Sequence, residues 1–341
     1  SLIPTQFIAA KDNPESAGLK AGLNISRAKY LEFRSNKFNI PGLKSAQPGS
    51  NIGTLNNIVI FIRFQYQSEF QEEFSYYNNS FNGTNMVSMN NYFDDVSNDQ
   101  IEINTGFYPS PNQNTIVSYQ DNQPRGYYMP YSVSNPSGYN GDSQRTTREH
   151  TLLKNAVNHV KSQIEATGKD FDMDNDGEVD NICFIIQGQT AGWSDLLWPH
   201  MWALYSENVY IGTSRVYTFN FQLSEAFGVS VLCHEMFHSL GSPDLYHYDD
   251  KVIDPVGTWD LMNWNRNPPQ HMTVHMKQKY GGWINSIPEI TSSGTYQLEP
   301  LSQNPFAAYK IPSPNSSSEF FVVEYRKAEG QFESSLPGSG L

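Results

Sequence analysis

The distribution of apolar residues predicts strands that alternate with long helices. Runs rich in β-branched and aromatic residues indicate buried strands, and apolar positions spaced by three and four residues indicate amphipathic helices. Strands are predicted over residues 57–65, 100–108, 179–188 and 215–223, and helices over residues 85–97, 146–164, 225–241 and 271–282. After about residue 286 the pattern changes to short strands, at 295–300 and 320–325. This order predicts a fold of the α/β (α+β) class with a twisted mixed sheet, followed by a C-terminal β segment.

The same pattern divides the chain into three parts. Residues 1–55 show little periodicity and are rich in Pro, Gly, Ser and Asn, so we expect an N-terminal extension, the remnant of a pro-segment. Residues 56–285 would form the main domain, and residues 286–341 the β segment, which we expect to be truncated. Within the main domain, the Pro- and Asn-rich stretch 109–142 predicts a long loop of the kind that is often functional.

Composition excludes several classes of partner. The chain has 22 Lys and Arg against 35 Asp and Glu, a net charge of −13, which disfavours nucleic acid and anionic membrane surfaces. No apolar run is long enough for a transmembrane helix. Cys183 and Cys233 lie in apolar stretches, so two buried free thiols are favoured over a disulfide. The oligomeric state is left open, with a monomer favoured.

A zinc-binding pattern lies in the predicted helix 225–241. His234 and His238 are four residues apart, so on a helix their imidazoles share one face and point at one spot. Two neutral imidazole nitrogens at that spacing suit zinc. Glu235 directly follows the first histidine, within reach of a metal-bound water as its base.

The residues that follow predict a third ligand. Gly241 comes three residues after His238, and Asp244 three residues after Gly241. A helix cannot present a third ligand from the same face to the same metal, so the chain must turn sharply, and glycine tolerates the positive φ of such a turn. Three protein ligands plus water are the open coordination of a catalytic zinc ion. His247 is the alternative third ligand, at a less suitable spacing.

Several phrases of the sequence resemble a known family. The zinc motif reads HEMFHSLGSPDLY, and TWDLM and KQKYGGW follow it; YFDDVSNDQIEI, DMDNDGEVDN and LWPHMWAL precede it in the same order. From about Asn57 to its end, the sequence resembles the immune inhibitor A family of bacterial secreted zinc metallopeptidases, which is metzincin-like. The resemblance implies zinc on His234, His238 and Asp244, Glu235 as base and acid, and Met262 beneath the metal as a structural floor.

The sequence departs from the family pattern directly after Met262. The family usually has small residues there, whereas Asn263 and Trp264 follow here and would narrow the cleft. Some metzincins carry a tyrosine two residues after the turn methionine, and Trp264 cannot replace its hydroxyl. The sequence therefore does not identify the residue that stabilises the oxyanion.

An acidic stretch predicts a calcium site. Oxygen-bearing side chains alternate along it, with Gly177 at the sharp turn, as in the first part of an EF-hand loop. The predicted calcium ligands are Asp172, Asp174, Asp176, Glu178 and Asp180. Cys183 occupies the twelfth position, where an EF-hand has a bidentate glutamate, so the alternative is a solvated acidic turn. The resemblance favours calcium.

Three other histidines lie in patterns that could be part of a site. His200 lies among tryptophans and would either line the cleft or pack in the core. His271 and His275 share a helix face, but no glutamate follows His271, so we expect both to be solvent-exposed or capping.

The sequence as a whole predicts a secreted or cell-surface zinc endopeptidase that hydrolyses peptide bonds in proteins. Glu235 would take a proton from the metal-activated water and deliver it to the leaving amine. The strand near Tyr217–Phe221 would present an edge to an extended substrate. The alternatives are a glycan- or protein-binding module on an inactive peptidase scaffold, and a latent enzyme in which residues 1–55 plug the cleft.

Overall fold

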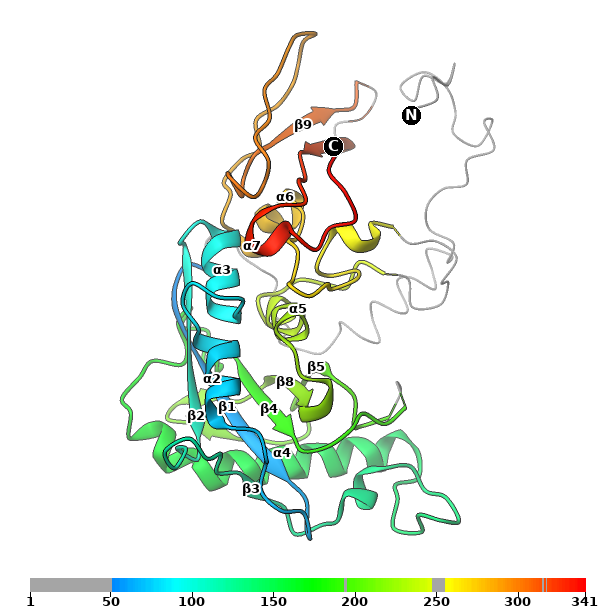
Figure 1. The fold of residues 1–341 in the computed structure, drawn as a ribbon. Coiled ribbons are helices and arrows are strands. Elements are labelled where there is room, and N and C mark those ends of the chain that lie inside the picture. The colour runs from blue at the N-terminus through cyan, green and yellow to red at the C-terminus, as the bar shows by residue number, and fades with distance from the viewer. Residues whose placement is uncertain (1–50, 193–194, 247–254, 315, 317) are drawn as a thin grey trace.

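The computed structural model describes residues 51–192, 195–246, 255–314, 316 and 318–341. Within these residues a mixed β-sheet lies between two helical layers, and an antiparallel β-hairpin follows near the end of the chain (Figure 1). This mixed α/β fold confirms the predicted fold class. Residues 1–50 of the predicted extension lie outside the described residues, and residues 53–55 already belong to the first strand.

The sheet has the strand order β2-β1-β4-β8-β5, and β3 pairs with the end of β1. Its strands are β1 (Gly53–Arg63), β2 (Ile101–Tyr108), β3 (Tyr119–Gln120), β4 (Ile182–Ile186), β5 (His200–Ala203) and β8 (Thr218–Leu223). All neighbours pair in parallel except β5, which runs antiparallel to β8 at one edge. The four predicted strands of the core correspond to β1, β2, β4 and β8.

Helices cover both faces of the sheet. The helices are α2 (Phe74–Asn82), α3 (Met89–Ser97), α4 (Gly141–Glu165), α5 (Val229–Ser239), α6 (Val274–Met276) and α7 (Gly330–Glu333). Helix α4 packs on one face, and α2, α3 and α5 pack on the other (Figure 1). Along β1, Val59 and Phe61 enter the core beneath α2, α3 and α5, whereas Ile58 and Ile60 enter the core beneath α4. A strand covered on both faces reads as a continuous apolar run.

One predicted property of the sheet is wrong. The segment 217–221 was expected to offer a free edge, but β8 has β4 on one side and β5 on the other. The sequence gives β5 little strand signal, because its four residues HMWA follow a proline and do not alternate in polarity. Among the described strands, β5 is therefore the edge next to β8.

The C-terminal part differs from the prediction in its details. The hairpin consists of β9 (Ala308–Pro312) and β10 (Phe320–Glu324), so the predicted strand 320–325 is confirmed, but the segment 295–300 is not a strand. The predicted helix 271–282 is shorter and consists of α6 followed by the π-helical segment η5 (Lys277–Gly281).

Several short elements complete the fold. They are the small pair β6 (Tyr210–Ile211) and β7 (Ser214–Arg215), and the 3-10 turns η2 (Arg125–Tyr128), η3 (Ser224–Ala226) and η4 (Gly257–Trp259). The turn η2 and strand β3 lie within the predicted loop 109–142. None of the helices in the described parts of the chain is long and apolar enough to cross a membrane.

Candidate metal centre

Helix α5 and the turn after it bring the predicted zinc ligands together. The helix ends at Ser239, and Gly241 has a φ of 102°, a value that residues with a Cβ rarely adopt. The amides of Gly241 and Ser242 donate to carbonyls of the last helical turn, which reverses the chain. Asp244 is thereby returned to the helix face that carries His234 and His238.

The three predicted ligand atoms form a small triangle. Oδ1 of Asp244 lies 3.1 Å from Nε2 of His234 and 3.1 Å from Nε2 of His238, and the two Nε2 atoms are 3.1 Å apart. Ligands placed tetrahedrally at zinc distances of about 2.0–2.2 Å are separated by about 3.3–3.5 Å. The triangle therefore has nearly the size that a tetrahedral zinc site requires. The three side chains are only 11–12% exposed.

Backbone carbonyls orient both imidazoles. Nδ1 of His234 lies 3.0 Å from the carbonyl oxygen of Leu261, and Nδ1 of His238 lies 2.7 Å from that of Ser242. Because a carbonyl only accepts, both Nδ1 atoms carry the proton, and each neutral ring presents the lone pair of Nε2 to the centre of the triangle. Two lone pairs and a carboxylate oxygen that converge in this way require a cation or a proton between them. Such outer partners are typical of histidines that bind metals.

The pKa shifts of two ligand residues indicate that the centre of the site favours a positive charge. Burial lowers the pKa of His238, but the charge and hydrogen bond of Asp244 outweigh it and raise that pKa to about 9. Burial alone would raise the pKa of the Asp244 carboxyl, but the two imidazoles hold that pKa well below its usual range. Without a metal, a proton would be held among these groups, and a divalent cation would take its place.

The predicted methionine turn contacts both parts of the ligand set. Met262 is fully buried, and its carbonyl oxygen accepts from the amide of Leu245, next to Asp244. The preceding residue, Leu261, provides the carbonyl that orients His234. The buried carboxylate of Asp260 accepts from the amide of Met262 at 2.8 Å and so closes the turn. The turn therefore fixes the ligands through its backbone, a role that the resemblance alone did not specify.

Glu235 is buried beside this triangle. It is 7% exposed, and no side-chain or backbone donor in the described part of the chain bonds its carboxylate. It is therefore available to accept a proton from a bound molecule. The residues after the turn are more open, since Trp264 is 61% exposed.

A chain of buried polar residues ties α5 to the sheet. The amide of Asn57 on β1 bonds Thr105 on β2, the amide of Asn181 bonds Asn57, and the amide of Asn220 on β8 bonds Asn181. Ser239, at the end of α5, donates to Asn181 at 2.7 Å and receives a bond from Asn220 at 3.1 Å. These bonds fix the position of α5 along the strands, and hence the height of Glu235 above the sheet.

The acidic loop brings together three of the five predicted calcium ligands. Carboxylate oxygens of Asp172, Asp174 and Asp176 lie within 4.8 Å of one another. Asp172 accepts from the amides of Asp176 and Gly177, which folds the loop around the cluster. The other two predicted ligands, Glu178 and Asp180, do not belong to this group, and the carboxylate of Asp180 accepts from the amide of Met173.

The loop gives a first testable prediction. If calcium binds the cluster, the melting temperature should rise with free calcium, because a ligand that binds only the folded state stabilises it. Asp174→Ala should abolish this rise, and Asp170→Ala, just outside the cluster, should preserve it. Thermal melts at increasing calcium concentration measure the effect. A wild-type melting temperature that ignores calcium would identify the loop as a solvated acidic turn.

The structure also places the remaining histidines. His200 faces α4, since its ring stacks on Phe221 at 5.0 Å and its Nε2 lies 3.5 Å from the Glu149 carboxylate. It therefore packs against the α4 side of the sheet, with its side chain 27% exposed. The prediction of an exposed or capping His271 is wrong, because this residue is 1% exposed. His247, the alternative zinc ligand, lies outside the described residues. The two cysteines are buried and free, as predicted.

A buried ionic cluster was missed by the sequence analysis. Arg326 is 3% exposed and bonds Glu333 at 2.6 and 2.7 Å, Glu324 at 3.1 Å, and the carbonyl of Trp259. Arg326 thus joins the C-terminal segment to the methionine turn. No local pattern marks such a contact, since its members are 67 residues apart. Residues on the two sides of the predicted boundary near residue 286 are therefore in contact.

Lys277 lies in the same region, and its burial gives a second prediction. The side chain is fully buried, with Nζ 2.9 Å from Nδ1 of His271 and 2.8 Å from the carbonyl of Pro305. Burial lowers its pKa from 10.5 to about 7 despite the nearby Glu324 carboxylate. Between about pH 7 and 10.5 the unfolded chain therefore binds the proton more tightly, so this residue makes stability rise with pH, by up to about 1.4 kcal/mol per pH unit.

Removing the titrating group should remove this dependence. The free energy of unfolding of wild type minus that of Lys277→Met should rise from pH 7 to pH 9, as measured by urea unfolding. Lys279→Met, which changes an exposed lysine two residues away, should give a flat difference. A flat difference for Lys277→Met as well would show that the buried amine does not titrate in this range.

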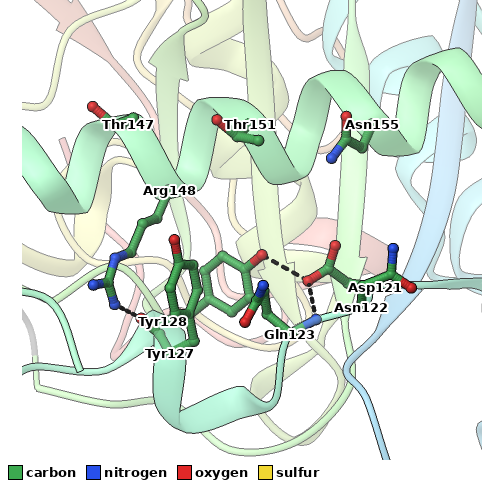
Figure 2. A pocket seen from close by; sticks show the side chains of 9 residues that line it. All are labelled: Asp121, Asn122, Gln123, Tyr127, Tyr128, Thr147, Arg148, Thr151 and Asn155. Atoms are coloured by element: carbon green, nitrogen blue, oxygen red, sulfur yellow. Dashed lines mark hydrogen bonds between the residues drawn. The ribbon is translucent and has the colours of Figure 1, made fainter. Parts of the chain in front are cut away.

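A shallow pocket lies on the other side of the sheet from α5. Its volume is about 200 Å³, and Figure 2 shows Thr147, Thr151 and Asn155 of α4 facing the segment 121–128 across it. The buried carboxylate of Asp121 already accepts hydrogen bonds from the Tyr128 hydroxyl and the backbone amide of Gln123. The pocket therefore adds no group to the metal centre.

The function of this site has to be inferred from its own residues. No protein-family model and no curated protein matches the chain.

Proposed function

We propose that the protein is a zinc-dependent endopeptidase, with zinc held by His234, His238 and Asp244. The observation that carries the proposal is the triangle of ligand atoms with edges of 3.1 Å, in which backbone carbonyls fix the tautomer of both histidines. The described residues supply three ligands, and a three-ligand site with a free position is typical of catalytic zinc, whereas structural zinc usually has four protein ligands.

The presence of Glu235 favours a catalytic zinc site, which hydrolyses a substrate, over a purely structural zinc site. A bound zinc ion would lower the pKa of a water molecule to about 7 and polarise the scissile carbonyl. The carboxylate of Glu235, which has no protein donor in the described chain, would accept a proton from the attacking water and deliver it to the leaving amine. None of the described residues bonds this carboxylate directly, so its presence beside the ligands favours catalysis over the alternative of an inactive binding scaffold.

The edge strand β5 would bind the substrate. It lies antiparallel to β8 and next to α5, and an extended peptide can add to such an edge through main-chain hydrogen bonds. Polypeptide is therefore the proposed substrate class. A secreted or cell-surface location follows from the resemblance and remains part of the proposal.

Cleavage of unfolded casein tests the function. The protein should cleave casein internally, lose activity on treatment with a zinc chelator, and regain it when about one equivalent of zinc is returned. Absence of cleavage by a protein that has been shown to contain zinc would overturn the peptidase and favour the binding scaffold.

A further inference from the structure

Gln222 on β8 has an unusual environment. Its side chain is fully buried, and both its Nε2 and its Oε1 lack a hydrogen-bond partner in the described structure. Buried side-chain amides nearly always have partners, because an unpaired buried polar group is destabilising. An apolar residue of similar size would fit the sheet better. The retained amide therefore points to a partner that the folded chain alone does not provide.

The alternation of side chains along β8 directs Gln222 towards α5. Phe219 and Phe221 enter the core beneath α4, so residues 218, 220 and 222 face the opposite side. Asn220 confirms this direction, since its amide bonds the hydroxyl of Ser239 on α5 at 3.1 Å.

The contact between Asn220 and Ser239 also fixes which part of α5 lies above Gln222. From residue 220 to residue 222 the strand advances about 6.6 Å, and about four helical residues cover that distance. Helix α5 follows β8 after a short turn, and its last residue, Ser239, bonds Asn220, so the helix runs back along the strand and four residues before Ser239 is Glu235. Glu235 also shares a helix face with Ser239, because the two are one turn apart.

The two side chains are complementary. Glu235 carries an acceptor without a protein donor, and Gln222 carries a donor without an acceptor. Cys183 on β4, which pairs with Asn220 two residues before Gln222, faces the same side of the sheet and has a raised pKa. Burial is the main cause of that shift, and the charge of Glu235 contributes to it.

We propose that Gln222 is a positioning residue for the proposed peptidase reaction. Its Nε2–H donates to a bridging water that in turn donates to the Glu235 carboxylate, and this bridge holds the carboxylate towards the three metal ligands. Gln222 contacts neither substrate nor metal. The inference rests on the proposed function, because orientation of Glu235 matters only if Glu235 transfers protons.

Replacement by an apolar residue of similar length tests the role. Gln222→Met should lower kcat by about 10- to 100-fold, the effect of a misplaced catalytic group, while KM stays within about twofold and the zinc content is unchanged. Gln222→Asn, which withdraws the amide by one methylene group, should give a smaller loss of the same kind. Gln187→Met is the matched control, because Gln187 directly follows β4 and its Oε1 also has no hydrogen-bond partner in the described structure. Its kcat should stay at the wild-type value.

A stability cycle tests the contact without using activity. The effects of Gln222→Met and Glu235→Ala on the melting temperature of the metal-free protein should be non-additive, whereas those of Gln187→Met and Glu235→Ala should add. An unchanged kcat in Gln222→Met, or additive melting temperatures, would overturn the inference. If the zinc-loaded wild type is inactive, the peptidase function and the positioning role of Gln222 both fail, and the cycle still decides whether the two side chains interact.

Discussion

Glu235→Gln should abolish most of the peptidase activity and leave the zinc content at the wild-type level. The amide cannot accept a proton from the attacking water, and removal of a general acid–base group typically costs about 100- to 10,000-fold in rate. The carboxylate has no direct protein donor in the described structure, and glutamine has nearly the same size, so Glu235→Gln should retain the fold. Initial rates on a quenched fluorescent peptide, combined with metal analysis of the same sample, measure both effects.

A nearby glutamate provides the control for this substitution. Glu225 lies on the exposed 3-10 turn before α5, and Glu225→Gln makes the same chemical change outside the site. Its activity should match that of the wild type. Full activity in Glu235→Gln would show that another residue is the base, and the peptidase mechanism proposed for this site would then be wrong.

The sequence was most informative where local geometry determines the result. The spacing of His234 and His238 places both imidazoles on one helix face, and Gly241 allows the turn that returns Asp244 to them. These relations span only eleven residues, so a single sequence contains them. The same holds for β1 and α4, whose apolar patterns are long and unambiguous.

The sequence was least informative where distant segments meet. The carbonyl of Leu261 orients His234, which is 27 residues away in the sequence. Every residue has a backbone carbonyl, so the sequence does not indicate which one bonds the histidine. Arg326 and Trp259 are 67 residues apart, and a buried arginine has the same local pattern as an exposed one. The edge strand β5 is short and becomes a strand through its pairing with β8, which is tertiary context and not intrinsic propensity.

These distant contacts give the metal centre its rigidity. The turn that carries Asp260 and Met262 holds the ligand segment from one side, and Arg326 holds the preceding residue of that turn from the C-terminal segment. The Asn181 chain holds α5 from the sheet. A site fixed from three directions can keep ligand atoms 3.1 Å apart before a metal arrives, which lowers the conformational cost of binding.

Asp244→Ala should remove most of the zinc affinity. The carboxylate supplies one of three ligand atoms, and its loss leaves two imidazoles that face each other without an anionic partner. Loss of an outer partner of a metal ligand typically costs 10- to 100-fold in affinity, and loss of a ligand should exceed that. Competition with a zinc-binding dye measures the dissociation constant, and casein cleavage should fall in parallel.

His247→Ala distinguishes the two candidates for the third ligand. If Asp244 is the ligand, this variant should bind zinc and cleave casein close to wild-type levels, because Asp244 already lies 3.1 Å from both imidazoles. The position of Asp244 follows directly from the turn at Gly241, whereas His247 would need three further residues of chain to return to the same point. The reverse pattern, with zinc lost in His247→Ala and kept in Asp244→Ala, would contradict the ligand set. The triangle would then be an ordinary hydrogen-bonded cluster, in which the proton shared by His238 and Asp244 takes the place assigned to the metal.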